Sequence, residues 1–183
     1  MIDDVEILDI KKVEKPKQTR VYELTFKEDG KVKKKEVIKT LDVAKILIYH
    51  KDKDAFVLVK QFRPLVYINH PDSAIRYELC GGRADKDMSI EDIAKEEVLE
   101  ETGYKVQEIK KITTFTTSGK MHLFYTEVCN HDRQTAGGGV DYENIDVFYL
   151  PTKEAKEFMF DETKPKRPAM MFSLCWWFSM REQ

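Results

Sequence analysis

The chain has 183 residues, enough for one domain with a sizeable core, and its 42% hydrophobic and 35% charged residues are typical of a soluble globular protein. Its 31 basic and 33 acidic side chains leave a net charge of -2, which argues against a nucleic-acid-binding surface. The longest apolar run, residues 169–180, is too short to span a bilayer. Residues 1–18 lack a signal-peptide-like apolar stretch, and Cys80, Cys129 and Cys175 lack zinc-site spacing. We therefore expect a cytoplasmic protein with free thiols and neither a membrane nor a nucleic-acid partner.

Residues 1–40 predict a small appendage of antiparallel strands. Hydrophobic residues alternate roughly along residues 21–26, and the sequence Glu-Asp-Gly-Lys at 28–31 predicts a hairpin turn. Four lysines between positions 31 and 35 fit either a basic patch or, more simply, the solvent side and protected edge of the hairpin. An isolated hairpin is marginally stable, so we expect it to pack on the main domain or on a second subunit.

Residues 44–49 and 55–62 predict two strands joined by a polar turn. Their near-continuous apolar character indicates that both faces are covered, as in a sheet between helices. The second strand ends at Arg63, whose planar guanidinium suits a phosphate group and equally suits a structural pair with a nearby carboxylate.

A loop is expected between residues 64 and 75, followed by a short strand over residues 76–79. This strand leads directly into the glycine pair Gly81 and Gly82. Glu78 therefore lies just ahead of the pair, where it either contacts substrate or is an ordinary outward-facing strand residue.

The stretch from Gly81 to Tyr104 predicts a loop and then a helix of about four turns. Ser89 followed by Asp92 has the spacing of a helix N-cap, and Gly103 suits the left-handed residue just past a helix end. The inward stripe of this helix begins with apolar residues and continues with carboxylates: Ile90, Ile93, Ala94, Glu97 and Glu101, with Glu100 at its edge.

An acidic helix usually has a solvated face, but here two carboxylates occupy positions where an amphipathic helix carries leucines. Buried, unpaired carboxylates are costly and raise each other's pKa. A divalent cation with oxygen ligands, such as Mg²⁺, removes both costs. The helix therefore predicts a metal site.

The same stretch resembles the Nudix box, G-x5-E-x7-R-E-U-x-E-E-x-G-U, in which U is a bulky apolar residue. The residues in register are Gly82, Glu97, Val98, Glu100, Glu101, Gly103 and Tyr104. Met88 replaces the first Glu and Glu96 replaces the Arg, which leaves open how the carboxylates are oriented. The resemblance implies a metal-dependent hydrolase that uses Mg²⁺ or Mn²⁺. Its implied metal ligands are Glu97, Glu100, Glu101 and the carbonyl of Gly81.

The remaining chain predicts a hairpin over 109–128, a loop over 130–142, a strand over 145–150, and helices over 152–160 and 168–180. Three glycines in the loop lack the Lys-Ser/Thr of a phosphate-binding P-loop, so we interpret the loop as flexible. Asp141 and Glu143 follow these glycines, where a mobile loop delivers carboxylates to a site when substrate is present. The Met- and Trp-rich last helix predicts core or dimer packing.

Four segments outside or flanking the box resemble the nucleoside-diphosphate-sugar branch of the Nudix hydrolases, and most of all its UDP-sugar diphosphatases. They are residues 56–67, 77–82, 124–128 and the stretch from the glycines to 147. The resemblance implies an α/β/α sandwich with a mixed sheet, formed by residues 41–183. It also implies a homodimer in which the strands of residues 1–40 pack on the partner subunit. Arg63 is implied to contact the diphosphate, Glu143 to bind metal, and Asp141 to act as the base.

We therefore expect Mg²⁺-dependent hydrolysis of a nucleoside diphosphate sugar, such as UDP-glucose, to a nucleoside monophosphate and a sugar 1-phosphate. The alternatives are an ADP-ribose diphosphatase and a non-catalytic nucleotide-binding Nudix domain, the latter favoured by Met88 and Glu96. The expected catalytic residues are Glu100, Asp141 and Arg63; the substrate-binding residues are Arg63, Glu78 and Gly82; and the metal ligands are Gly81, Glu97, Glu100, Glu101 and Glu143.

Overall fold

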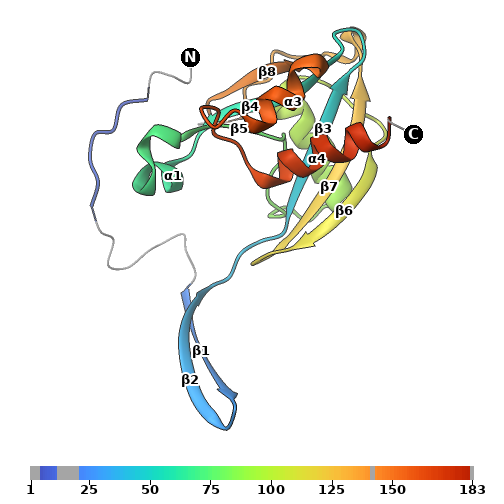
Figure 1. Cartoon of the computed structure of the whole chain (residues 1–183). Helices are drawn as coiled ribbons and strands as arrows, with labels where there is room; N and C mark the ends of the chain where they lie inside the picture. The colour runs from blue at the N-terminus through green and yellow to red at the C-terminus, as the bar shows by residue number, and fades with distance from the viewer. Residues whose placement is uncertain (1–4, 12–20, 141–142, 182–183) are drawn as a thin grey trace.

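A computed structural model of the chain contains a mixed sheet of six strands between two layers of helices (Figure 1). The structure describes residues 5–11, 21–140 and 143–181. The six strands are β3 (Val43–His50), β4 (Ala55–Phe62), β5 (Ile75–Glu78), β6 (Lys110–Thr116), β7 (Lys120–Val128) and β8 (Ile145–Pro151). Five of them follow the order β5-β4-β3-β7-β6. The sixth, β8, lies off this path and pairs with β4 along residues 55–61. Only β3 and β7 among the described pairs run parallel.

Helices cover both faces of this sheet. On one face lies α2 (Ile90–Glu97), which continues into a π-helical turn, η2 (Val98–Thr102). On the other face lie α3 (Thr152–Phe160) and α4 (Pro168–Ser179). The predicted α/β/α sandwich is therefore confirmed.

The continuous apolar runs of the central strands follow from this double cover. In β3, Ile46 and Ile48 pack in the core beneath α2, while Leu47 and Tyr49 pack in the core beneath α3 and α4. Successive strand side chains point to opposite faces, so a strand covered on both faces needs apolar residues at every position. In α4, Trp177 is buried in the second core, so the predicted core packing of this helix is confirmed.

The prediction of a loop between β4 and β5 was wrong. This segment forms a short helix, α1 (Pro64–Asn69), and a 3₁₀ turn, η1 (Pro71–Ser73). Pro64 stands in the first turn of α1, where a proline lacks only an N–H that would have no helical partner. A second 3₁₀ turn, η3 (Asn130–Asp132), follows β7.

The predicted N-terminal hairpin is confirmed as β1 (Val21–Glu28) and β2 (Lys31–Ile38). Asp29 and Gly30 at its turn have φ values of 52° and 75°, as a type I′ turn requires. The hairpin extends away from the sandwich, and nearly all its residues are exposed (Figure 1). Among the described residues, the main domain does not cover the hairpin, so the second subunit remains the expected covering surface.

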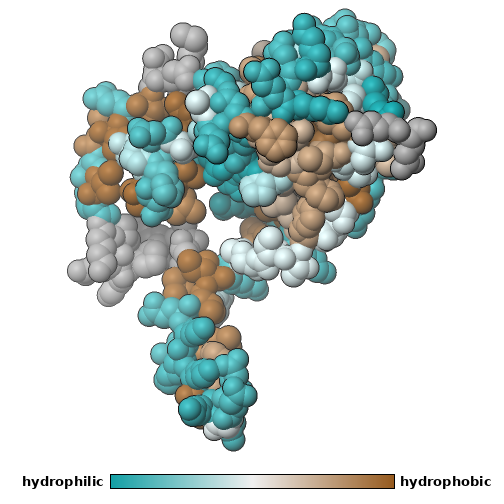
Figure 2. All heavy atoms as spheres, viewed as in Figure 1, coloured by the Kyte–Doolittle hydropathy of each residue, from teal (hydrophilic) through white to brown (hydrophobic). Residues whose placement is uncertain are grey.

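Large apolar side chains remain on the surface of this part of the molecule. Figure 2 shows them on the hairpin and on the side that carries α1 and residues 5–11. Leu8 is 86% exposed and Leu65 of α1 is 80% exposed. Among the helices that the structure describes, none has the length and apolar character needed to cross a bilayer.

Candidate metal centre

The helix that carries the Nudix-like residues begins and ends where the sequence predicts. The Ser89 hydroxyl accepts a hydrogen bond from the Asp92 backbone N–H at 3.1 Å. At the other end, Gly103 has a φ of 78°, and its N–H donates to the carbonyl of Leu99 at 3.0 Å. The last turn is π-helical, a local widening that is frequent at functional sites.

Both inward carboxylates of this helix face the glycine pair that precedes it. Glu101 is 4% exposed, and its Oε2 accepts a hydrogen bond from the N–H of Gly81 at 2.9 Å. A Cβ atom added at Gly82 would overlap the carboxylate of Glu97. Gly82 is therefore a glycine because the Glu97 carboxylate occupies the space of a side chain.

Neighbouring carboxylates raise the pKa values of Glu97 and Glu101. Burial, followed by repulsion from Glu101 and Glu100, raises the pKa of Glu97 to about 7. Burial also raises the pKa of Glu101, although the positive charge of Lys45 lowers it in part. Glu143 adds repulsion to both. A cluster of oxygen donors that resists carrying its own charge fits a hard divalent cation such as Mg²⁺.

The glycine-rich loop packs against the end of the same helix. The N–H groups of Gly138 and Gly139 donate to the carbonyls of Glu101 and Glu100, at 2.9 and 3.0 Å. A Cβ atom added at Gly139 would lie 2.9 Å from an oxygen of Glu143. The described part of the loop therefore caps the helix end, and its glycines allow this close approach. Asp141 lies outside the described residues.

Arg63, at the end of β4, forms a structural pair with Glu78 of β5. Nε and Nη2 of Arg63 donate to the two Glu78 carboxylate oxygens at 3.0 and 2.6 Å, and Nε of Arg167 donates at 2.9 Å. Glu78 is 1% exposed, so it is not an outward-facing strand residue. Burial raises the pKa of Glu78, but the bonds and charges of its basic neighbours outweigh burial and hold the pKa below its ordinary value.

Sequence reasoning missed three residues of this region. Lys45 of β3 is buried, and its Nζ donates to the carbonyl of Gly81 at 2.5 Å. The sequence feature that could have identified Lys45 is a lysine within an otherwise apolar strand. Cys80 is completely buried; burial and its hydrogen bond with Glu101 raise the pKa of its thiol. Arg167 precedes α4, far along the chain from Glu78, and carries no sequence signal.

Lys86 provides a cation near the position where the Nudix box has its arginine. Its Nζ lies 2.6 Å from the carboxylate of Glu96 and 3.9 Å from that of Glu100. Glu96, which replaces the arginine, therefore brings this lysine to the outer side of the helix. The pair with Lys86, from the preceding loop, neutralises the negative charge that Glu96 introduces at this position.

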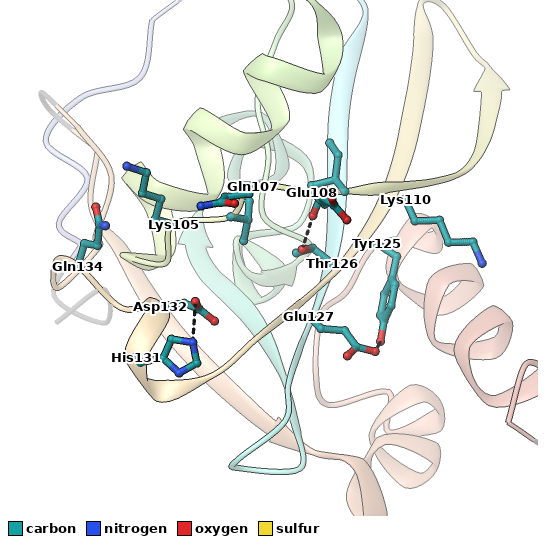
Figure 3. Close-up of a pocket in the computed structure, with 12 residues that line it drawn as sticks. Lys105, Gln107, Glu108, Lys110, Tyr125, Thr126, Glu127, His131, Asp132 and Gln134 are labelled. Atoms are coloured by element: carbon teal, nitrogen blue, oxygen red, sulfur yellow. Dashed lines mark hydrogen bonds and ion pairs between the residues drawn. The ribbon is translucent and has the colours of Figure 1, made fainter.

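A surface hollow elsewhere on the molecule is not lined by any of the candidate metal ligands. It has a volume of about 720 Å³ and lies between residues 105–110, the end of β7 and η3 (Figure 3). At its edge His131 and Asp132 cluster with Cys129. The Asp132 carboxylate and the Cys129 thiol are engaged in a reciprocal cap of η3, which explains their proximity. These donors already have structural partners, so the metal centre is better placed at the acidic helix.

Comparison with known proteins agrees with this geometry. The NUDIX domain model matches residues 39–172. A GDP-mannose pyrophosphatase of Klebsiella pneumoniae is 37% identical over 147 residues, covering 76% of this chain and 73% of that protein. A uridine diphosphate glucose pyrophosphatase of Bos taurus is 31% identical over 191 residues, covering 85% and 86%. The crystal structure of an ADP compounds hydrolase, 16% identical, matches with a TM-score of 0.66 over 97% of this chain and 92% of that one, which supports the fold. The chain belongs to the Nudix family.

Proposed function

We propose that the protein hydrolyses the diphosphate bond of a nucleoside diphosphate sugar, giving a nucleoside monophosphate and a sugar 1-phosphate. The main support for this proposal is the cluster of the Glu97 and Glu101 carboxylates, which contacts the glycine pair Gly81 and Gly82. Within this cluster the pKa of Glu97 is raised to about 7. A carboxylate cluster of this kind suits a metal-assisted hydrolase. The named activities of two relatives, on UDP-glucose and GDP-mannose, support a nucleotide sugar as the substrate class.

The residues that would hold the divalent ion are Glu97, Glu100, Glu101 and Glu143. The ion is Mg²⁺, or Mn²⁺ as a substitute. A divalent ion suits this site because burial and neighbouring negative charges raise the pKa values of Glu97 and Glu101. A bound cation stabilises the charged carboxylates against both effects. When bound, such an ion supplies positive charge to the diphosphate and makes water more acidic.

Arg63 is the residue that would bind the diphosphate. Two of its donor nitrogens are fixed by Glu78 and its side chain remains 28% exposed. A guanidinium has five N–H donors, so these two bonds leave others for phosphoryl oxygens. Glu78 then has a positioning role, because its carboxylate is committed to Arg63 and Arg167. Gly82 would contribute by admitting the Glu97 carboxylate close to the backbone.

Asp141 is the residue that we assign to take the proton from the attacking water. It follows the loop whose glycine N–H groups donate to the carbonyls of Glu100 and Glu101. Glu143, two positions later, is near enough to the helix carboxylates to raise the pKa of Glu97. Glu100 is the alternative base on the helix itself.

The working unit that we propose is a homodimer, with residues 1–40 as the dimer-forming appendage of the hydrolase domain at 41–183. One face of the hairpin carries Tyr22, Leu24 and Val37, which are 47%, 51% and 38% exposed. An apolar face of this kind needs a covering surface, and a second copy of the chain provides one.

The test is a comparison of kcat/KM for UDP-glucose, GDP-mannose and ADP-ribose on one preparation, with and without Mg²⁺. We expect UDP-glucose to exceed ADP-ribose by about tenfold or more, because the base pocket, unlike the metal centre, distinguishes them. GDP-mannose is the second candidate because of the relative that is 37% identical. Glu101→Gln is the matched inactive control. Turnover that persists in excess EDTA contradicts the metal requirement. A tenfold preference for ADP-ribose contradicts the assignment to the UDP-sugar branch and leaves the metal chemistry in place.

A further inference from the structure

Lys45 is a charged residue in the middle of a core strand. Its neighbours Ala44 and Ile46 are completely buried, and Lys45 itself is 8% exposed. Lysine is almost never buried to this degree without partners, because removing an ammonium group from water is costly. The partners of Lys45 therefore indicate why this position is not apolar like the rest of β3.

The Lys45 ammonium is bound by two backbone carbonyls. Its Nζ donates to the carbonyl of Leu79 at 3.2 Å and to that of Gly81 at 2.5 Å. Both carbonyls lie beyond the end of the β4–β5 ladder, whose last pair on this side is Val59 with Glu78. The intervening carbonyl of Cys80 instead accepts from the N–H of Ile46 in β3. Carbonyls that have left a ladder need other donors when they are buried.

The charge of the same ammonium acts on Glu78 and on two carboxylates of the candidate metal centre. Its charge lowers the pKa values of Glu78, Glu97 and Glu101, in each case against the opposing effect of burial. Backbone carbonyl and carboxylate oxygens are the donors that a hard metal cation prefers. Lys45 thus occupies a cation position, with the Gly81 carbonyl that the Nudix resemblance assigns to a metal.

We propose that the Lys45 ammonium is a built-in cation of the metal centre, which holds the Gly81 carbonyl and takes the place of one divalent ion. Divalent ions then bind at the helix carboxylates alone. This inference rests on the proposed function, because it assumes that the helix carboxylates bind a metal. It changes the number of ions and the ligand set that the family resemblance implies.

The experiment counts Mn²⁺ ions bound per chain by electron paramagnetic resonance, with no substrate present. The variants are Lys45→Met, which removes the charge and keeps the length of the side chain, and Lys86→Met as the matched control. Lys86 is also a cation beside helix carboxylates, but its described partners are Glu96 and Glu100 and not a carbonyl of the glycine segment. Circular dichroism checks folding. Lys45→Thr, whose β-branched side chain suits a strand, replaces the Met variant if that variant does not fold.

We expect Lys45→Met to bind one more Mn²⁺ per chain than the natural protein, and Lys86→Met to change affinity but not the number bound. Metal-free Lys45→Met should also melt at a lower temperature, because the two carbonyls lose their donor, and should gain more in melting temperature from Mn²⁺. An unchanged or smaller number of ions in Lys45→Met and Lys45→Thr overturns the proposal. Failure of the proposed function is a separate result: ions bind as expected but nucleotide sugars are not hydrolysed.

Discussion

Replacing Glu97 with glutamine should stabilise the metal-free protein while abolishing its stabilisation by metal. Burial and the charges of Glu101 and Glu100 raise the pKa of Glu97 to about 7. At pH 8 without a divalent ion, the Glu97 carboxylate is charged in the folded protein, although its surroundings favour the neutral form. This charge lowers the free energy of unfolding. A glutamine side chain has the same shape without the charge, so Glu97→Gln removes this cost.

The size and sign of the effect follow from the two pKa values. The interval from 4.5 in the unfolded chain to about 7 in the folded protein corresponds to about 3 kcal/mol. Because Glu97 is only partly buried, solvent screening lowers this figure to about 2 kcal/mol. The folded pKa is raised, so the favourable contribution of the protonated carboxyl is complete below pH 4.5 and disappears as the pH rises through about 7.

The assay is urea unfolding in EDTA at pH 4.5 and pH 8. Glu97→Gln should match the natural protein at pH 4.5 and exceed its free energy of unfolding by about 2 kcal/mol at pH 8. Glu91→Gln, an exposed position in the first turn of the same helix, is the control and should change stability by about 0.5 kcal/mol or less. Added Mg²⁺ should stabilise the natural protein and leave Glu97→Gln almost unchanged. A Glu97→Gln variant that is less stable at pH 8 in EDTA would refute the reasoning.

Three further predictions test other parts of the site. Gly82→Ala should weaken Mn²⁺ binding at least about tenfold in a titration, since its Cβ displaces the Glu97 carboxylate; unchanged affinity would contradict this contact. Asp141→Asn should lower kcat at least about a hundredfold with metal affinity preserved, and an inactive Glu143→Gln beside an active Asp141→Asn would reverse the two roles. Deleting residues 1–40 should convert a dimer to a monomer in light scattering, and a monomeric full-length chain would remove the basis of the dimer proposal.

The sequence by itself determined the ends of the helix that carries the site and the side of it that faces inward. The cap at Ser89, the left-handed Gly103 and the helical period place Glu97 and Glu101 on the inward side, because these rules involve residues only a few positions apart. The Asp-Gly turn of the hairpin and the doubly covered strands were predictable for the same reason. The region around α1 was not, since a single short turn of helix carries little periodicity.

The partners of the site residues were decided by tertiary structure alone. Arg63 had two equally good interpretations in the sequence, and only the approach of β5 to β4, with Arg167 arriving from the start of α4, pairs it with Glu78. Lys45 shows the same limit. Its strand could be predicted, but the carbonyls that bind its ammonium become available only where the segment after β5 leaves β4 and runs beside β3. A buried charge is stabilised by whichever groups the fold brings within hydrogen-bonding distance, and those groups are distant in the chain.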